Sequence, residues 1–375
     1  MEEQFVEKKS MRLNELPTDL LVDVLSRLPE KSLCRFTCVS KEWQSLISSP
    51  HPGFVKALRR QRLHRKSYLY IWNISLFDGN VESDVEDCSL RISIVDTVNE
   101  RIQENYCLPI NNMNPFIYTV ISCHDLLCLA QTKISICNLS TQEKAILPDP
   151  DHLGHVGIGF GYSSVSKEFK IVRWFMQKKD GRMSMGCEIF SLTNRLRFKS
   201  DSWKLTETRP FEFLSKPSVF VNGVIFWQIL NPTFKNFFES NSILAFDLDE
   251  EEPQIISCPK LSPDTVAHLV ELKECLYLAH CSKGKAIVKI WRLEDQKNSL
   301  WVSEYYINFS SICNTIVPLT SVLAGHVEEL VFISVKGKGL LYYNVESGKM
   351  RKPENLENFT LRWYEFPCVL RNMEF

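Results

Sequence analysis

The chain has 375 residues, of which 44% are hydrophobic and 24% charged, and its formal net charge is −1. This length accommodates two domains, or one small and one large domain. A charge so close to zero gives no overall attraction to nucleic acid or to a membrane surface, and we expect neither as a partner.

Neither a secretory leader nor a membrane span is expected. The first ten residues, MEEQFVEKKS, are polar and acidic, and no run of about 18 apolar residues occurs. The 13 cysteines are an odd number without a secretory signal, which favours reduced thiols in the cytoplasm, the nucleus or both. No cysteine has partners at zinc-site spacing, so we expect no metal and no cofactor.

The first element expected is a helix that begins near residue 18. Thr18 and Asp19 are of the types that cap a helix N-terminus, and Pro29 closes the segment. The apolar residues follow an i, i+1, i+4, i+5, i+8 spacing, which is typical of one helix face. They are Leu20, Leu21, Val24, Leu25 and Leu28.

Two more short helices are expected to follow. The second is marked by three apolar residues, Leu33, Phe36 and Val39. Ser40 is expected to cap the third. The apolar face of the third consists of Trp43, Leu46 and Ile47. Three short helices in about 35 residues cannot bury all of this apolar surface among themselves, so part of it is expected to face a partner.

These helices match one family motif along its whole length. The matching residues are Leu16, Pro17, Leu20, Val24, Leu25, Leu28, Pro29, Ser32, Leu33, Arg35, Phe36, Val39, Ser40, Lys41, Trp43, Leu46 and Ile47. Residues 13–54 thus resemble the F-box, by which substrate adaptors join a cullin–RING ubiquitin ligase through its Skp-type linker subunit. The resemblance implies a docking surface formed or supported by Leu16, Pro17, Leu20, Leu21, Val24, Leu25, Leu28, Pro29, Leu33, Phe36, Val39 and Trp43.

A basic connector is expected at residues 55–66, which contain the sequence LRRQRLHRK. We interpret it as a solvated helix end or linker. A nuclear-import signal or a patch for an anionic partner is the alternative.

From about Ser67 onward the pattern changes to short strands rich in Val, Ile, Phe, Trp and Tyr. Strand-like segments that run into a polar turn recur about every 50 residues. They are SICNL at 135–139, EIFSL at 188–192, LAFDL at 244–248, KIWRL at 289–293 and LYYNV at 341–345, with a weaker copy, RISIVD, at 91–96.

A second recurring strand precedes several of these segments. Its copies are HDLLCLA at 124–130, NGVIFWQ at 222–228, KECLYLA at 273–279 and EELVFIS at 328–334. Each pair looks like a strand, a loop of variable length and a returning antiparallel strand.

Residues 67–375 are therefore expected to form an all-β repeat domain, a kelch-like β-propeller of about six units. Packing small sheets face to face around an axis covers their faces and shortens their exposed edges. A strand from residues 357–370 is expected to close the ring. The alternative is a β-sandwich or two smaller β domains.

Six segments of this region, taken in order, match a second family. They lie at 126–148, 157–173, 188–207, 219–229, 243–256 and 287–295. They resemble the F-box-associated interaction domain of plant F-box proteins. The segment RLRFKSDSW at 195–203 carries more residues than the turn expected there, which suggests a lengthened hairpin.

No catalytic constellation is apparent in the sequence. Gly157, Gly159 and Gly161 form G-x-G-x-G, but a dinucleotide site would need this motif to open a helix. Here a second apolar segment follows, so we expect a strand beside a hairpin. We expect no catalytic residues and no enzymatic activity. In the ligase class that the resemblance implies, the RING subunit and its charged E2 perform the chemistry, and the adaptor supplies proximity.

Three aromatic residues in one loop-like segment are the candidates for substrate capture: Phe234, Phe237 and Phe238. The alternative is a loop that folds back onto the core. The sequence thus predicts the substrate-recognition adaptor of an SCF-type (cullin–RING) E3 ubiquitin ligase, which captures an unidentified protein. A propeller enzyme, or a receptor for a small molecule or glycan, is the alternative, and its N-terminal helices would then be incidental or regulatory.

Overall fold

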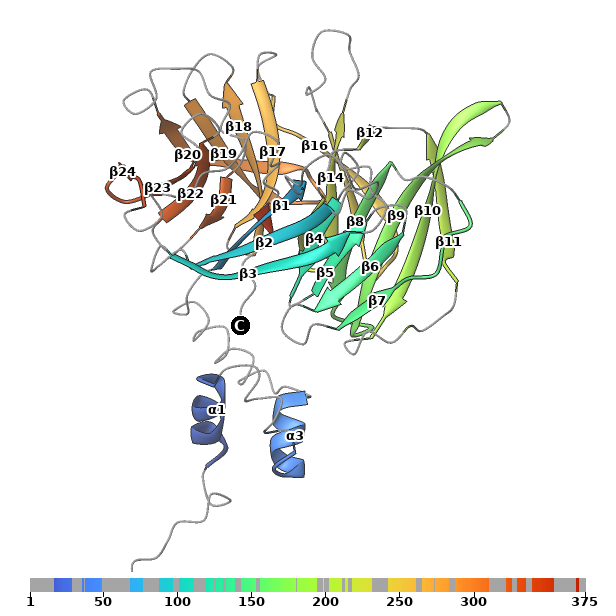
Figure 1. The fold of residues 1–375 in the computed structure, drawn as a ribbon. Coiled ribbons are helices and arrows are strands. Elements are labelled where there is room, and N and C mark those ends of the chain that lie inside the picture. The colour runs from blue at the N-terminus through green and yellow to red at the C-terminus, as the bar shows by residue number, and fades with distance from the viewer. Residues whose placement is uncertain are drawn as a thin grey trace, which may run out of the picture. The chain divides into compact units, whose positions relative to one another are not determined.

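The computed structural model divides into two compact units, one with residues Met1–Lys66 and Glu374–Phe375 and the other with Ser67–Met373. We call them the helical unit and the β unit (Figure 1). The residues that the structure describes are 17–28, 36, 38–48, 68–76, 88–96, 101–110, 119–124, 126–130, 133–138, 143–152, 156–179, 181–193, 198, 202–210, 213–214, 218–230, 242–260, 265–272, 274–282, 287–309, 322–325, 329–334, 339–353 and 369–370.

The helical unit contains α1 (Thr18–Ser26) and α3 (Lys41–Ser48). The prediction that Thr18 or Asp19 caps α1 is wrong, because the N-cap is Pro17. Its carbonyl accepts hydrogen bonds from the N–H groups of Leu20 and Leu21, both at 3.0 Å. Proline suits this place because its fixed φ, here −53°, fits the extended residue before a helix and it has no N–H to satisfy.

The predicted cap of α3 is confirmed. The Ser40 hydroxyl oxygen accepts a hydrogen bond from the N–H of Trp43 at 3.1 Å. The predicted second helix lies mostly outside the described residues. Of the helices that the structure describes, none is long and apolar enough to cross a membrane.

A small apolar core joins α1 to α3. Leu21, Leu25 and Leu46 are buried, and the residues packed against them are Val22, Leu28, Phe36, Trp43 and Ile47. The rings of Phe36 and Trp43 meet edge to face, with centroids 5.4 Å apart. Trp43, Leu46 and Ile47 therefore share one face of α3, as predicted.

The described strands of the β unit form six antiparallel sheets along the chain. The first has β1 (Tyr68–Leu76), β2 (Cys88–Asp96), β3 (Arg101–Ile110) and the C-terminal β25 (Val369–Leu370). The second has β4 (Thr119–Cys123), β5 (Leu126–Ala130), β6 (Ile134–Asn138) and β7 (Lys144–Ile146). The third has β8 (Gly157–Ser163), β9 (Glu168–Lys179), β10 (Arg182–Leu192) and β11 (Lys204–Pro210).

The fifth and sixth sheets again have four strands, and the fourth has five, because both β12 and β13 pair with β14. The fourth has β12 (Phe213–Leu214), β13 (Val219–Val221), β14 (Val224–Leu230), β15 (Ser242–Asp247) and β16 (Pro253–Ser257). The fifth has β17 (Thr265–Leu272), β18 (Cys275–Ser282), β19 (Ile287–Asp295) and β20 (Leu300–Asn308). The sixth has β21 (Val322–Gly325), β22 (Glu329–Ser334), β23 (Gly339–Asn344) and β24 (Met350–Arg351).

The first strands of successive sheets lie against one another. β25 contacts β4, β4 contacts β8, β8 contacts β13, β13 contacts β17 and β17 contacts β21. Every residue of β4 is buried, whereas the fourth strand of the fifth sheet, β20, is mostly exposed. The fourth strands of the sheets are thus the least buried, an arrangement consistent with a β-propeller (Figure 1).

Both recurring sequence elements occupy fixed positions in these sheets. The second element supplies the second strand, as in β5, β14, β18 and β22. The first element supplies the third strand, as in β6, β10, β15, β19 and β23. The weaker copy at 91–96 lies in β2, which is also the third strand of its sheet because β25 stands first.

The predicted closing strand is confirmed. Val369 and Leu370 pair antiparallel with Ile71 and Tyr70 of β1. The first sheet is thereby completed by the two ends of the β unit. The C-terminal strand is thereby hydrogen-bonded to the first strand of the β unit in the sequence.

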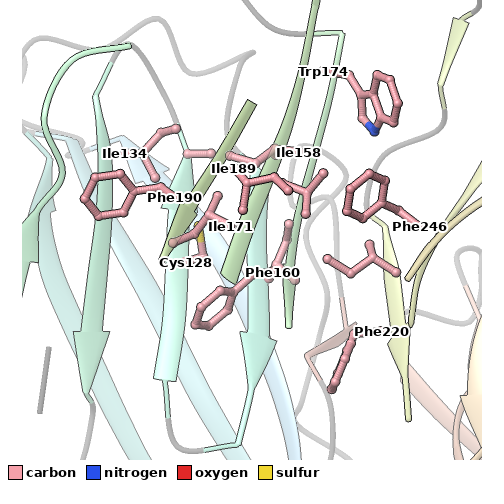
Figure 2. Close-up of a cluster of buried hydrophobic side chains, with 14 of the residues drawn as sticks. Cys128, Ile134, Ile158, Phe160, Ile171, Trp174, Ile189, Phe190, Phe220 and Phe246 are labelled. Atoms are coloured by element: carbon pink, nitrogen blue, oxygen red, sulfur yellow. The ribbon is translucent and has the colours of Figure 1, made fainter. Parts of the chain in front are cut away.

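The three glycines of β8 allow close packing of the third sheet on the fourth. A Cβ atom on Gly159 would lie 2.5 Å from Ile225 and 2.6 Å from Trp227, and one on Gly161 would lie 2.5 Å from Phe220. The G-x-G-x-G motif is therefore a packing device inside a strand that pairs with β9, as predicted. Figure 2 shows the buried cluster around it, which draws side chains from the second, third and fourth sheets.

The two ends of the sheets differ in their connections. The turns between first and second strands and between third and fourth strands meet at one end, which we call the turn end. Several turns there are tight and contain a residue with positive φ, such as His124 (54°) and Asn222 (46°). The opposite end, which we call the loop end, has the connections between second and third strands and those between sheets.

Candidate docking site

An apolar stripe lies exposed on α1. Leu20 and Val24, one helical turn apart, are 53% and 49% exposed. Pro17, three residues before Leu20, is exposed as well. Large apolar side chains that remain in water along one helix face are typical of a surface that a partner covers.

The predicted docking residues divide into this exposed stripe and a buried support. Leu21 and Leu25 are buried, and Leu28, Phe36 and Trp43 pack against them. The five therefore hold α1 and α3 together, whereas Pro17, Leu20 and Val24 face solvent. Val39, two residues before α3, is 58% exposed and is a further apolar side chain in water. Leu16, Pro29 and Leu33 lie outside the described residues.

A polar border runs beside the stripe. The carboxylate of Asp23 pairs with the guanidinium of Arg27 at 2.8 Å, one turn apart on α1. The Ser26 hydroxyl donates to the carbonyl of Asp23 at 2.8 Å. The exposed apolar residues thus lie next to satisfied polar groups, which is the arrangement of an interface centre and its rim.

The residues predicted for substrate capture cannot be placed individually. Phe234, Phe237 and Phe238 lie outside the described residues, in the chain that connects β14 to β15. Because these are the second and third strands of the fourth sheet, their connection belongs to the loop end.

An exposed methionine pair at the loop end was missed from the sequence. Met176 of β9 and Met183 of β10 are 52% and 46% exposed. In the sequence both occur within apolar strand patterns that predict burial. The signal that sets them apart is the length of β9 and β10, which have 12 and 11 residues.

A buried ion pair was also missed, and its role is structural. Arg173 and Glu188 pair at 2.6 Å, and each side chain is only 2% exposed. Burial lowers the pKa of Arg173, although Glu188 counteracts this. The guanidinium also donates to the carbonyl of His152 at 2.5 Å, and the His152 ring contacts Glu188. The pair thereby attaches the connection between the second and third sheets to the third sheet.

Several described titratable or hydroxyl groups are buried or held by their neighbours. Burial raises the pKa of the Cys128 thiol far above its usual range and lowers the pKa of His280, with a further contribution from Lys289 to the latter. The Ser163 hydroxyl is held by Asp249 and accepts from the N–H of Ser166 at 3.0 Å. Within the described ranges, no three His, Cys, Asp or Glu residues are grouped to hold a metal ion.

Two family descriptions match the chain. The F-box domain matches residues 13–54, and the F-box associated beta propeller domain matches residues 84–367. The second match alone spans more than half of the chain.

Curated relatives from Arabidopsis thaliana align with most of the chain. F-box protein At5g18160 is 28% identical over 308 residues, which are 78% of this chain and 70% of the relative. F-box protein At1g30790 is 24% identical and covers 92% of this chain and 90% of its own length. F-box protein CPR1 is 24% identical and covers 89% and 83%.

Solved structures give weaker similarities. An oligogalacturonate lyase in complex with manganese aligns with 76% of this chain and 78% of its own, at 8% identity and a TM-score of 0.43. The structure of YjhT aligns with 63% and 82%, at 11% identity and a TM-score of 0.41. Similarities at this level support no conclusion about activity.

Proposed function

The chain belongs to the F-box proteins with an F-box-associated β-propeller domain, and on this premise we propose that it is the substrate-recognition adaptor of an SCF-type ubiquitin ligase. The F-box, residues 13–54, docks on a Skp-type linker subunit and through it on a cullin–RING ligase. Residues 55–66 connect it to the propeller, residues 67–375, which captures the substrate protein.

The observation that carries the docking role is the exposed stripe Pro17, Leu20 and Val24. A helix is stabilised by burying its apolar side chains, and α1 already buries Leu21 and Leu25 against α3. Its second apolar face stays in water. A groove on the partner that accepts this face would bury residues at i, i+3 and i+7, which is the spacing of helix-in-groove recognition.

The predicted docking residues then have two roles. Pro17, Leu20, Val24 and Val39 contact the linker directly. Leu21, Leu25, Leu28, Phe36 and Trp43 support the helices from inside, so truncating them weakens docking through loss of the fold. Leu16, Pro29 and Leu33 remain predicted docking residues on the strength of the motif alone.

Substrate capture is assigned to the loop end of a six-bladed propeller. Six sheets, first strands in mutual contact, and a β25–β1 closure support this architecture. Loops on a rigid scaffold are where recognition residues concentrate, and most of the longer connections belong to the loop end, the exception being residues 193–203 between β10 and β11.

The adaptor itself performs no chemistry. It raises the effective concentration of a substrate lysine near the charged E2, which is a proximity effect. Neither a metal nor a cofactor takes part in the proposed role. The proposed site of action is the cytoplasm, the nucleus or both.

Deleting residues 13–54 tests the docking role. The full chain should co-purify with a Skp-type subunit, and the deleted chain should not. Deleting residues 1–12, which precede the motif, is the matched control and should leave co-purification intact. Undiminished co-purification of the chain without residues 13–54 would refute the adaptor role.

Replacing Phe234, Phe237 and Phe238 together by Ser tests the capture role of the β14–β15 connection. If this connection recognises the substrate, the variant should label a different set of neighbouring proteins. Its Skp binding and its melting temperature should be unchanged. A strongly lowered melting temperature would show that the aromatic residues belong to the core. An unaltered partner set in a normally folded variant would show that this connection has no recognition role.

A further inference from the structure

The third sheet extends at the loop end beyond its own first strand. β8 begins at Gly157, which pairs with Trp174. β9 and β10 continue past this point and remain paired with each other up to Lys179 and Arg182. We call residues 175–179 and 181–186 the β9–β10 extension, and Figure 1 shows both strands reaching beyond β8.

The register assigns the extension's side chains to two faces. Met176 is directly opposite Met185, and Lys178 is directly opposite Met183. Met185 is also opposite Arg209 of β11. Because cross-strand partners and alternate residues share a face, all five lie on the face that also carries Trp174. We call Met176, Lys178, Met183, Met185 and Arg209 the methionine face.

The methionine face leaves large apolar surface in water. Met176 and Met183 are about half exposed, whereas Met185 between them is fully buried. Methionine is among the residue types most often buried, so two exposed copies on one short hairpin are unusual. Its flexible, polarizable side chain adapts to partners of different shape, which makes it common on recognition surfaces.

Positive charge borders the two exposed methionines. Lys178 is exposed, and Arg209 lies at the other side of the buried Met185. On this face the register places two basic residues, Lys178 and Arg209, and one acidic residue, Glu207, which lies one row further into the sheet, opposite Cys187. The surface is therefore apolar at its centre and cationic at its border, and its complement is apolar and anionic.

We propose that the methionine face binds a segment of the substrate protein that combines apolar side chains with acidic ones. Its apolar side chains pack on Met176 and Met183, and its carboxylates pair with Lys178 and Arg209. The proposal rests on the proposed function, because it specifies which protein segment the propeller captures.

Other occupants fit this face less well. A second copy in a two-fold interface would bring Lys178 and Arg209 against the same cations of the partner copy. Single-stranded nucleic acid is bound by aromatic platforms within a positively charged groove, and the exposed apolar residues here are methionines.

A peptide-display selection on the immobilised full-length chain in complex with a Skp-type subunit tests the proposal. The probe is a library of random twelve-residue peptides. Selected peptides should be enriched in Asp and Glu together with Leu, Ile, Phe or Met. Their affinity should fall several-fold between 50 and 300 mM salt, because screening weakens exposed charge pairs.

Variants on the two faces of the β9–β10 hairpin show which face binds the selected peptides. The double variant M176S/M183S and the single variant K178E should each weaken the selected peptides at least about fivefold, a loss of about 1 kcal/mol. R182E is the matched control, because it makes the same charge change on the same hairpin but on the opposite face. It should change affinity less than about twofold. K178E alters only an exposed side chain, so its result stands even where M176S/M183S fails to fold.

Four outcomes would overturn the proposal. Selected peptides without acidic enrichment would do so, as would equal losses in K178E and R182E. Binding to vesicles that contain phosphatidylserine, or a dimer lost in K178E, would assign the face to a lipid or a second copy. In each case intact Skp binding would leave the proposed function standing. If the chain did not bind a Skp-type subunit but the chain alone still selected acidic, apolar peptides, only the adaptor role would be refuted.

Discussion

Individual residues decide how closely the sheets of the β unit approach. Gly159 brings β8 against Ile225 and Trp227 of the fourth sheet, and the Trp227 indole donates to the carbonyl of Ile158 at 3.2 Å. Between the same sheets, Glu251 accepts from Lys170 at 2.8 Å and from Lys204 at 2.5 Å. Apolar contact and charge pairing therefore fix the same sheet junction.

A methyl group on Gly159 should disrupt this junction. G159A places its Cβ within 2.6 Å of two side chains, and overpacking of this kind destabilises a core by about 1–3 kcal/mol. Shortening one of the two clashing neighbours should restore part of the lost stability. The free energy of unfolding should therefore fall less in G159A/I225A than the sum of its falls in G159A and I225A. Chemical denaturation of the four proteins measures this coupling, and strictly additive losses would contradict the packing role of the glycine.

The ion pairs of Glu251 with Lys170 and Lys204 should make the stability of the β unit change with pH in the acidic range. Burial acts to raise the pKa of Glu251, but hydrogen bonds from Lys170 and Lys204 outweigh it, and the pKa lies below its ordinary value of 4.5. A carboxyl group whose pKa is lowered by folding contributes stability above its unfolded pKa and loses it as the pH falls through the folded value.

The variant E251Q should therefore be less stable than the natural chain at pH 7, by about 1 kcal/mol. The difference should persist down to about pH 4.5 and shrink below it. Melting curves between pH 3 and 7 measure it, with E250Q, an exposed residue of the same turn, as the control. A difference that stays constant with pH would mean that the charge of Glu251 plays no part.

At the scale of elements, the sheets repeat one plan, in which neighbouring strands follow one another along the chain. One sheet departs from this order. The third-to-fourth turns share a device, in which an Asp or Asn side chain accepts from backbone N–H groups further along. Asp247, Asp295 and Asn344 each do so. The exception is the first sheet, whose first strand, β25, comes from the other end of the β unit.

Truncating the chain at Asn355 should destabilise the whole β unit. The truncation removes β25, so β1 loses its partner and β4 loses a neighbour. Circular dichroism should show a melting temperature lower by several degrees for residues 67–355 than for residues 67–375, in one cooperative transition. Identical melting of the two fragments would contradict closure by β25.

Predictability from the sequence differed between elements. The recurring strands and the closing strand could be predicted, because each follows from local apolar patterning and from the period of the repeat. The division of α1 into an exposed and a buried face could not be predicted. Leu20 and Leu21 are adjacent apolar residues, and only the position of α3 decides which of the two is buried. The methionine face was missed because it depends on where β8 begins relative to β9, which no local pattern encodes.

At the scale of the whole molecule, the two units carry the two halves of the proposed function. In this proposal, the helical unit offers its apolar helix face to a Skp-type linker, and the β unit captures the substrate at its loop end. The docking half is the central claim, because substrate capture leads to ubiquitination only when the ligase is attached.

Calorimetric titration of the purified full-length chain with a Skp-type subunit tests this claim most directly. L20D/V24D places two charges on the exposed stripe, where a partner's groove would desolvate them. We predict that it weakens binding at least about a hundredfold, or about 2.7 kcal/mol. The control V165D, at a 77% exposed residue of the β8–β9 turn, should bind like the natural chain. Equal affinity of L20D/V24D and the natural chain would contradict docking through α1.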